Sequence, residues 1–160
     1  MLPSGAIASP PKIRVCGPLL SCDTWGMNIT RGQTVGSKRG PADYFTGTVW
    51  VDEIAAGPNQ SAVRAGSVSF EPGARTAWHT HPLGQMLHIV SGVGRVQKEG
   101  GPAIEVAPGD TIWFEPGERH WHGAAPNRAM VHLAIHQADP SGNAVTWLEP
   151  VSDADYNRSA

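Results

Sequence analysis

The sequence predicts an all-β domain of the barrel or sandwich type. Short runs of strand-forming residues recur between turn signals, and about ten such runs follow one another from residue 43 onward. The 19 glycines and 14 prolines lie between these runs instead of forming one low-complexity block, as is typical of tight turns. No convincing helical stripe competes with this pattern. A chain of 160 residues, 40% of them hydrophobic, has room for one compact domain with a buried core.

The predicted strands follow one another along the chain, and turns at 71–73, 107–110 and 115–117 supply tight corners between them. The runs rich in β-branched, aromatic and other strand-forming residues cover 43–45, 48–51, 67–70, 86–90, 94–97, 104–106, 111–114, 120–122, 129–135 and 145–148. Many short antiparallel strands of this kind are typical of barrels and jelly rolls.

Three regions are expected along the chain. Residues 1–40 have few apolar positions and many turn formers, so we expect an arm that is partly disordered or docks on a neighbour. Residues 41–150 are expected to form the barrel, and residues 151–160 a C-terminal tail. Met27 could be the native initiator, in which case the residues before it are an upstream extension.

The composition argues against several partners and compartments. The 12 Lys and Arg nearly balance the 14 Asp and Glu without long charged runs, so neither nucleic acid nor an anionic membrane is an expected partner. Pro3, Pro10 and Pro11 interrupt the N-terminal apolar residues, which does not suit a secretory signal, and a cytoplasmic location is expected. Cys16 and Cys22 are then interpreted as free thiols, although a disulfide or a metal pair is the alternative.

All seven histidines lie between His79 and His136. In a strand, His79 and His81 project to the same face and can aim both imidazoles at one point. Gln85 follows a short turn and could bring its carbonyl oxygen there, and His120 would complete the set from a distant strand. Three imidazoles and an amide oxygen suit a divalent first-row metal ion with positions left open for water or substrate.

The alternative is that these histidines are hydrogen-bonded structural residues. That interpretation is favoured for a lone histidine, but a His-x-His pair with a nearby oxygen ligand and a distant histidine favours a metal. The identity of the ion stays open, because Mn²⁺, Fe²⁺, Ni²⁺, Co²⁺ and Zn²⁺ all accept such ligands.

Two patterns in the sequence resemble the paired motifs of the cupin family. The first is Gly73-x5-His79-x-His81-x3-Gln85-x6-Gly92, and the second is Gly109-x5-Glu115-x-Gly117-x2-His120. Gln85 stands where the commoner motif has Glu, while Glu115 and Ala124 replace the usual Pro and Asn. The last two differences concern turn shape. The resemblance covers about residues 40–156 and implies a double-stranded β-helix, or jelly-roll, fold in a single domain.

Four phrases are similar to small bacterial cupins that include the manganese-dependent hydroxynitrile lyases: GPADYFTGTVWVD, FEPGARTAWHTHPLGQ, EPGERHWHGAAP and AMVHLAI. This resemblance implies Mn²⁺ held by His79, His81, Gln85 and His120. Those enzymes begin near the position of Met27. A neutral Gln85 ligand leaves the ion its full double charge, which favours Lewis-acid chemistry over oxygen activation.

Three further histidines are candidate catalytic residues. His122 shares a strand face with His120 and is the first choice for general base. His132 and His136 share one face of the strand predicted at 129–135 and continued to His136. The resemblance implies that this face lines the pocket. The alternative is that the two histidines form a hydrogen-bonded structural pair in the pocket wall. His88 has the opposite parity to Gln85 and should face away. The candidate residues for the apolar mouth, each of which could instead be ordinary core, are Val68, Phe70 and Trp113.

The leading interpretation is a metal-dependent lyase that cleaves a cyanohydrin into aldehyde and cyanide, with a pocket histidine as base. A cupin oxygenase or isomerase acting on a small carbonyl or phenolic compound is a second interpretation, because one fold hosts many reactions. A non-catalytic cupin that binds a small molecule is a third. In each case the expected partner is a small molecule, and a homodimer or homotetramer is expected.

Overall fold

The computed structural model describes residues 21–22, 28–56 and 61–158, so Cys16 and Met27 lie outside the described residues. The chain divides into two compact units, Met1–Val35 and Gly36–Ala160. In the first unit, β1 (Ser21–Cys22) pairs antiparallel with β2 (Asn28–Ile29), and a short 3-10 helix, η1, covers Gly32–Thr34. No helix among the described residues is long and apolar enough to cross a membrane.

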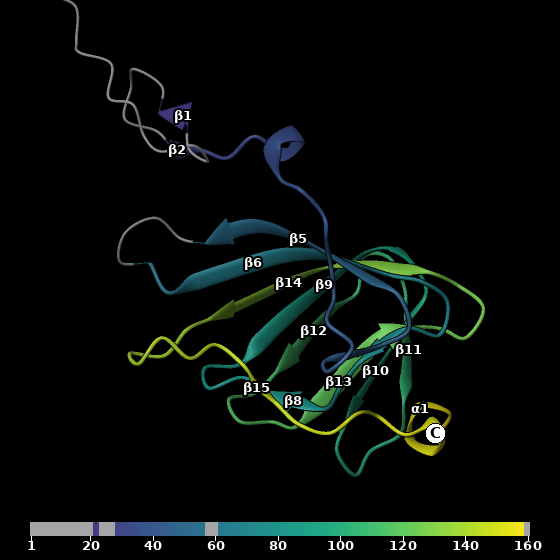
Figure 1. The fold of residues 1–160 in the computed structure, drawn as a ribbon. Helices are drawn as coiled ribbons and strands as arrows, with labels where there is room; N and C mark the ends of the chain where they lie inside the picture. The colour runs from purple at the N-terminus through teal and green to yellow at the C-terminus, as the bar shows by residue number, and fades with distance from the viewer. Residues whose placement is uncertain (1–20, 23–27, 57–60, 159–160) are drawn as a thin grey trace, which may run out of the picture. The chain divides into compact units, whose positions relative to one another are not determined.

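The second unit consists of two antiparallel sheets that face each other (Figure 1). The six-stranded sheet has the order β12 (Thr111–Phe114), β9 (Gln85–Gly92), β14 (Met130–Gln137), β6 (Val63–Phe70), β5 (Val49–Ala56) and β3 (Lys38–Arg39). The seven-stranded sheet has the order β11 (Ile104–Val106), β10 (Gly94–Lys98), β13 (His120–Ala124), β7 (Arg75–Thr76) and β4 (Phe45–Thr46), with β8 (His79–Thr80) bridging β13 and β15 (Thr146–Trp147). The predicted all-β jelly-roll class is confirmed.

The predicted strands recur with three kinds of difference. β5 (Val49–Ala56) and β6 (Val63–Phe70) extend well beyond the predicted runs 48–51 and 67–70. Residues 42–44 form a turn in which the Tyr44 N–H donates to the Pro41 carbonyl, so the strand predicted at 43–45 begins only at Phe45. The two-residue strands β3, β7 and β8 were not predicted. Segments this short show no alternation in the sequence, and only pairing with distant strands defines them.

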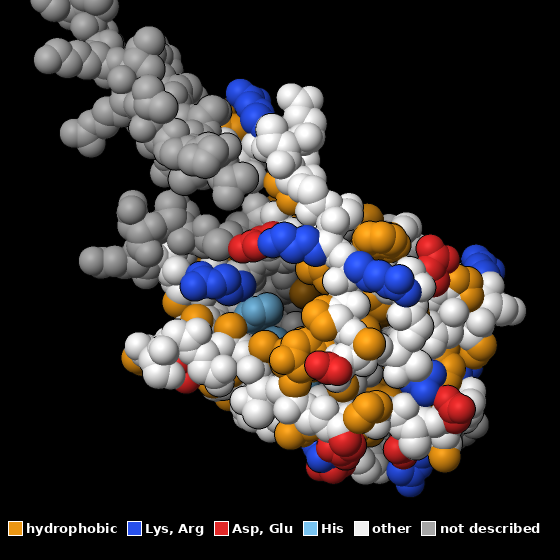
Figure 2. Space-filling model, in the orientation of Figure 1, with side chains coloured by type: hydrophobic (Ala, Val, Ile, Leu, Met, Phe, Trp, Pro, Cys, Tyr) orange, Lys and Arg blue, Asp and Glu red, His pale blue; other side chains and the backbone are white. Residues whose placement is uncertain are grey.

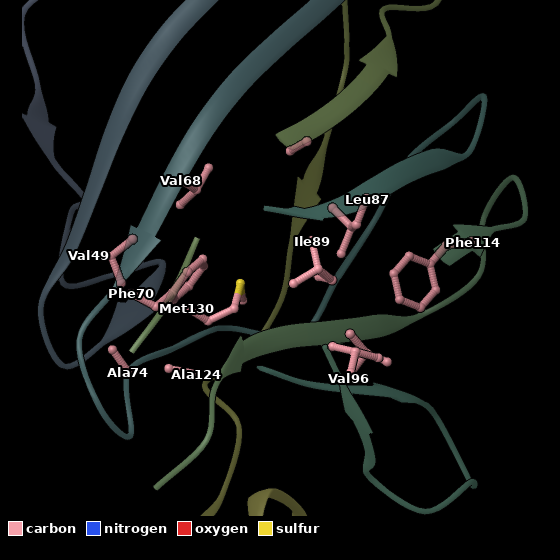
Figure 3. Close-up of a cluster of buried hydrophobic side chains, with 12 residues drawn as sticks. Val49, Val68, Phe70, Ala74, Leu87, Ile89, Val96, Phe114, Ala124 and Met130 are labelled. Carbon is pink, nitrogen blue, oxygen red and sulfur yellow. The ribbon is translucent and has the colours of Figure 1, made fainter. Parts of the chain in front are cut away.

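The core lies between the two sheets, because each strand turns alternate side chains toward the other sheet. Figure 3 shows this cluster, in which Phe70 and Met130 from one sheet lie close to Ala124 from the other. The buried members are Val49, Val68, Phe70, Ala74, Leu87, Ile89, Val96, Val106, Phe114, Ala124, Met130 and Ala134. One end of the space between the sheets is filled by this cluster, which leaves the other end for polar side chains.

The segment expected to be a C-terminal tail packs on the outside of the seven-stranded sheet. Its short helix α1 (Asp153–Tyr156) is capped by the Ser152 hydroxyl, which accepts a hydrogen bond from the Asp155 N–H. The Tyr156 hydroxyl donates to the Ala124 carbonyl at 2.7 Å. Trp78 and Trp121, which alternate with site histidines and point away from the site, form a second apolar cluster with Val151 and Tyr156. The C-terminal segment therefore covers the outer face of the seven-stranded sheet.

Gly92 ends β9 in a left-handed conformation, and replacing it should be costly. A Cβ there would lie 1.9 Å from the Ala129 carbonyl oxygen, and φ is +80°. Gly109 also has a positive φ, +95°, but nothing lies within 4 Å of a Cβ built there. Replacing Gly109 therefore measures the cost of the backbone conformation alone, without a steric clash. We expect Gly92→Ala to lower the free energy of unfolding in urea by more than about 3 kcal/mol, and Gly109→Ala by about 1 kcal/mol. Equal losses would contradict this account of the close approach.

Candidate metal centre and pocket

Four polar side chains from three parts of the chain meet between the two sheets. His79 on β8 pairs in register with His120, the first residue of β13. His81 follows β8 directly, and a turn in which Gly84 N–H bonds the His81 carbonyl leads into Gln85, the first residue of β9. These four side chains are at most 3% exposed. Short strands and one tight turn thus bring the residues of the first motif to the residue of the second.

The distances within this group are short. The ring centroids of His79 and His120 lie 4.3 Å apart, and those of His79 and His81 lie 5.3 Å apart. The Oε1 atom of Gln85 lies 3.0 Å from Nε2 of His120, and the Gln85 side chain raises the pKa of His79 and His81 against the larger effect of burial. The amide oxygen therefore lies among three imidazoles.

Backbone carbonyls fix the orientation of all three rings. The Nδ1 atoms of His79, His81 and His120 lie 2.9, 2.6 and 2.8 Å from the carbonyl oxygens of Ala77, Ala144 and Glu118, respectively. A carbonyl oxygen only accepts, so each Nδ1 carries the proton and each Nε2 presents a lone pair. Nε2 of His81 is buried and has no hydrogen-bond partner among the described residues. This donor set fits a divalent metal ion.

A second grouping of histidines overlaps with this one. Among the described residues, one set of three has potential ligand atoms within 4.8 Å of one another: His79, His120 and His122. Such a three-histidine group can hold a divalent metal ion. The two sets share His79 and His120 and differ in whether His81 or His122 is the third ligand. His122 lacks the backbone-carbonyl contact that orients the other rings, since its Nδ1 faces Nε2 of His132 at 3.1 Å.

Burial keeps these imidazoles neutral. It lowers the pKa of His79, His81 and His120 to about 3, with the neighbouring histidines adding to the shift. It also lowers the pKa of His122 well below 6.5 and that of His132 to about 4. The rings are therefore unprotonated at neutral pH, which is the state that binds a metal ion or accepts a proton.

The three candidate catalytic histidines occupy different positions. His122 and His136 both line the pocket, and each has one buried ring nitrogen without a partner among the described residues. The His136 ring lies 4.6 Å from that of His81. His132 is fully buried behind His122 and is not a lining residue. His88 faces away as expected, with Nδ1 2.9 Å from the Thr111 hydroxyl.

The pocket is a cavity of about 160 Å³ at the open end of the barrel. Figure 2 shows histidine side chains in this hollow, with hydrophobic side chains beside and below it and Lys, Arg and acidic side chains along its upper edge. None of the lining residues is Asp, Glu, Lys or Arg: they are Phe45, Val51, Gly66, Val68, Thr76, His79, His81, Gln85, His122, Ala134, His136, Val145 and Trp147. The titratable groups in the lining are therefore all imidazoles.

The three candidate residues for the apolar mouth occupy three different positions relative to the pocket. Val68 lines the pocket, whereas Phe70 lies behind it and packs edge-on against His122 at 5.9 Å between ring centroids. Trp113 is 54% exposed and does not line the pocket, which corrects that expectation. Successive residues of a strand point to opposite faces, and in β12 the neighbouring Phe114 points inward, so Trp113 points outward. The Phe114 ring stacks on His120 with 3.7 Å between ring centroids and 7° between ring planes.

Sequence reasoning missed the aromatic wall of the pocket. The ring centroid of Trp147 in β15 lies 4.8 Å from that of His79. The Trp147 ring also stacks on Tyr44, with 4.8 Å between ring centroids and 12° between ring planes, and Phe45 packs edge-on against it. Both Trp147 and Phe45 come from strands of only two residues. Their aromatic character was the one available signal, and it did not distinguish pocket from core.

Comparisons with known proteins agree with this architecture. A family model for the cupin domain matches residues 66–136. A Granulicella tundricola protein named (R)-mandelonitrile lyase is 55% identical over 132 residues, which are 82% of this chain and 100% of that protein. The solved structure of a cupin-like protein from Thermotoga maritima is 39% identical with a TM-score of 0.69, covering 74% of this chain and 89% of that one. The structure of the polyketide cyclase RemF from Streptomyces resistomycificus has a TM-score of 0.64 and covers 81% of this chain and 90% of that one. Its sequence is only 16% identical, so this similarity concerns the fold and not the function.

The facing sheets, the clustered histidines and these likenesses define one class, and the chain belongs to the cupin family. It is a small cupin with a single cupin domain. Within the family it is similar, over most of its length, to the protein named (R)-mandelonitrile lyase. The resemblance expected from the two sequence motifs is confirmed.

Metal binding should distinguish the two overlapping histidine sets. We expect His81→Ala to lower the bound Mn²⁺ of the full-length chain after dialysis by at least about tenfold, because it removes a preoriented Nε2 lone pair. His122→Ala, a matched removal of one buried imidazole, should retain the wild-type metal content. Elemental analysis of the dialysed proteins measures both. Loss of metal in His122→Ala with retention in His81→Ala would reverse the assignment.

The stability of the metal-free chain should fall as the pH falls from about 7 to about 5. The folded pKa of these histidines lies below the unfolded value of about 6.5, so the unfolded chain binds more protons in this range. Their contribution to stability is complete above about pH 6.5 and is lost progressively toward the folded pKa of about 3. Urea midpoints measured with a chelator test this, and a midpoint that stays constant between about pH 7 and 5 would contradict it.

Proposed function

We propose that this chain is a metal-dependent hydroxynitrile lyase, which cleaves a cyanohydrin into an aldehyde and hydrogen cyanide. The observation that carries the proposal is an apolar pocket in which neutral imidazoles are the titratable groups. A neutral substrate can enter it without burying a charge, and the histidines are the side chains of the lining that can take up a proton. The name of the 55% identical relative, (R)-mandelonitrile lyase, supports the same reaction.

In this proposal, His79, His81, Gln85 and His120 hold the metal ion, for which we propose Mn²⁺. When bound, a divalent ion supplies Lewis-acid stabilisation for negative charge that develops on oxygen or cyanide. The neutral amide of Gln85 adds no ligand charge that would weaken this effect. The cytoplasm stays the proposed compartment.

His122 is the proposed base. Its unpartnered Nε2 faces the pocket, and burial keeps the ring neutral at working pH. This nitrogen would take the hydroxyl proton while the carbonyl C=O forms and the C–C electron pair leaves with cyanide. The imidazolium would then return the proton to cyanide, so the products are the aldehyde and HCN. No further reactant is required.

His132 is proposed as a positioning residue that acts through His122. It does not line the pocket, but its Nε2 lies 3.1 Å from Nδ1 of His122 and Phe70 packs against both rings. This contact holds the base in one orientation. His136 places a second neutral imidazole in the lining, within reach of the same substrate.

The substrate's organic group is proposed to lie against the aromatic wall. Phe45 and Trp147 form this wall together with Val51 and Val68, and they provide flat apolar surface beside the imidazoles. An aryl group fits this surface better than a charged or strongly polar one. We therefore favour aromatic cyanohydrins.

Cyanide release from mandelonitrile tests the proposal. The full-length chain loaded with Mn²⁺ should release benzaldehyde and cyanide above the spontaneous rate, and removal of the metal should abolish this activity. His122→Ala should lower kcat by at least about 100-fold, the usual size of a general-base contribution. His88→Ala, a matched loss of an imidazole outside the pocket, should leave kcat unchanged.

Two results would argue for the other interpretations. Oxygen uptake by the iron-loaded protein, without metal-dependent cyanide release, would favour an oxygenase. Tight binding of an aromatic alcohol without turnover of any cyanohydrin would favour a binding protein. Either outcome would overturn the proposed lyase.

A further inference from the structure

The sheet face that lines the pocket continues beyond the pocket into charged side chains. Residues that pair directly across antiparallel strands point to the same face of a sheet. Gln85, His136 and Arg64 form one such row across β9, β14 and β6, and the first two line the pocket. Arg64 therefore shares the inner face with His136 and lies one strand further toward the edge of the sheet.

Two neighbouring rows of the same face also end in charged residues. Gly66 lines the pocket and pairs with Glu53 of β5. Val51 lines the pocket and pairs with Lys38 of β3. We name Lys38, Glu53 and Arg64 the charged rim, because all three share the inner face with lining residues. Figure 2 shows Lys, Arg and acidic side chains along the upper edge of the hollow.

Two of the three charges in the rim compensate each other. The Nζ atom of Lys38 lies 3.9 Å from Oε2 of Glu53, in an exposed ion pair. Arg64 forms no ion pair with any carboxylate of the described residues. The charged rim therefore has one positive charge left over, and this charge belongs to Arg64.

Arg64 is held in place and still has donors for a ligand. Its Nη1 donates to the carbonyl oxygens of Ser61 and Val63 at 3.2 and 3.1 Å, which ties the half-buried side chain to the start of β6. Within the part of the chain that the structure describes, Nε and Nη2 of Arg64 have no acceptor. Two such N–H groups of one guanidinium match the two oxygens of a carboxylate.

The charge of Arg64 also acts on the pocket lining. Burial lowers the pKa of His136 from 6.5, and the positive charge of Arg64 lowers it further. The His136 ring in turn lies 4.6 Å from that of His81. With about 4.8 Å between neighbouring strands, the row from Gln85 to Arg64 spans about 10 Å. This spacing suits a substrate whose reacting carbon lies at the imidazoles and whose far end reaches the charged rim.

We propose that Arg64 binds a carboxylate at the far end of an aromatic substrate, so that the pocket prefers aryl compounds with an acidic group in the para position. The aryl ring lies against the aromatic wall, as in the proposed function on which the ring's position rests. The carboxylate stays at the half-buried rim, where it keeps part of its hydration and gains a charge-assisted pair. The neutral side chains deeper in the pocket offer no such partner.

Calorimetry of the full-length chain loaded with Mn²⁺ tests this proposal with two probes. The probes are para-hydroxymethylbenzoate and para-methylbenzyl alcohol, which share the ring and the alcohol and differ in the carboxylate. The wild-type chain should bind the carboxylate probe at least about tenfold more tightly. Arg64→Gln should abolish this preference, and Arg64→Lys should keep part of it, because a lysine retains the charge without the paired donors.

A matched control removes a guanidinium from the opposite face of the sheet. Arg39 follows Lys38 in β3 and pairs with Trp50, so its side chain points away from the pocket. Arg39→Gln should keep the full preference for the carboxylate probe. Circular dichroism of each variant would show that it is folded.

Three results would overturn the proposal. They are equal affinities of the wild-type chain for the two probes, binding of neither probe, and a preference that folded Arg64→Gln retains. The last result would mean that the carboxylate binds elsewhere, for example at the metal. Cyanide release from mandelonitrile is a separate measurement. If that release fails while Arg64→Gln abolishes the preference, the proposed reaction is wrong and the role of Arg64 stands.

Discussion

Three backbone carbonyls that bind the Nδ1 atoms of His79, His81 and His120 determine how this site is built. Two of the carbonyls lie two residues before the histidine that they hold, so the segments that lead into β8 and β13 orient these rings locally. The third belongs to Ala144, 63 residues from His81. The segment that leads into β15 is therefore part of the site, and it also supplies Trp147 to the pocket wall. One short segment thus links ligand orientation to pocket shape.

Burial of so many imidazoles has a cost that the fold has to offset. The rings lose hydration, and the resulting low pKa values mean that acid favours the unfolded chain. The apolar cluster at the other end of the barrel and the capped C-terminal segment supply the compensating packing. The same desolvation gives the site its chemistry, because neutral imidazoles in an uncharged pocket are free to bind a metal ion or accept a proton. Stability and function therefore depend on one environment.

Much of this could be predicted from the sequence, because strand alternation and motif spacing are local. They predicted that His79, His81, Gln85 and His120 converge and that His88 faces away. The placement of Trp113 at the mouth was wrong, since only strand pairing reveals that Phe114 is the inward residue. The position of His132 behind His122, the Ala144 carbonyl and the aromatic wall all depend on contacts between distant strands. Such contacts leave no periodic signal in the chain.

We propose that His79, His81, Gln85 and His120 together bind one divalent ion. Anomalous diffraction from crystals of the full-length chain grown with Mn²⁺ tests it most directly. We expect one strong manganese peak within coordinating distance of the Nε2 atoms of the three histidines and the Oε1 atom of Gln85. A peak bound by His122 in place of His81, or no peak among these side chains, would contradict it.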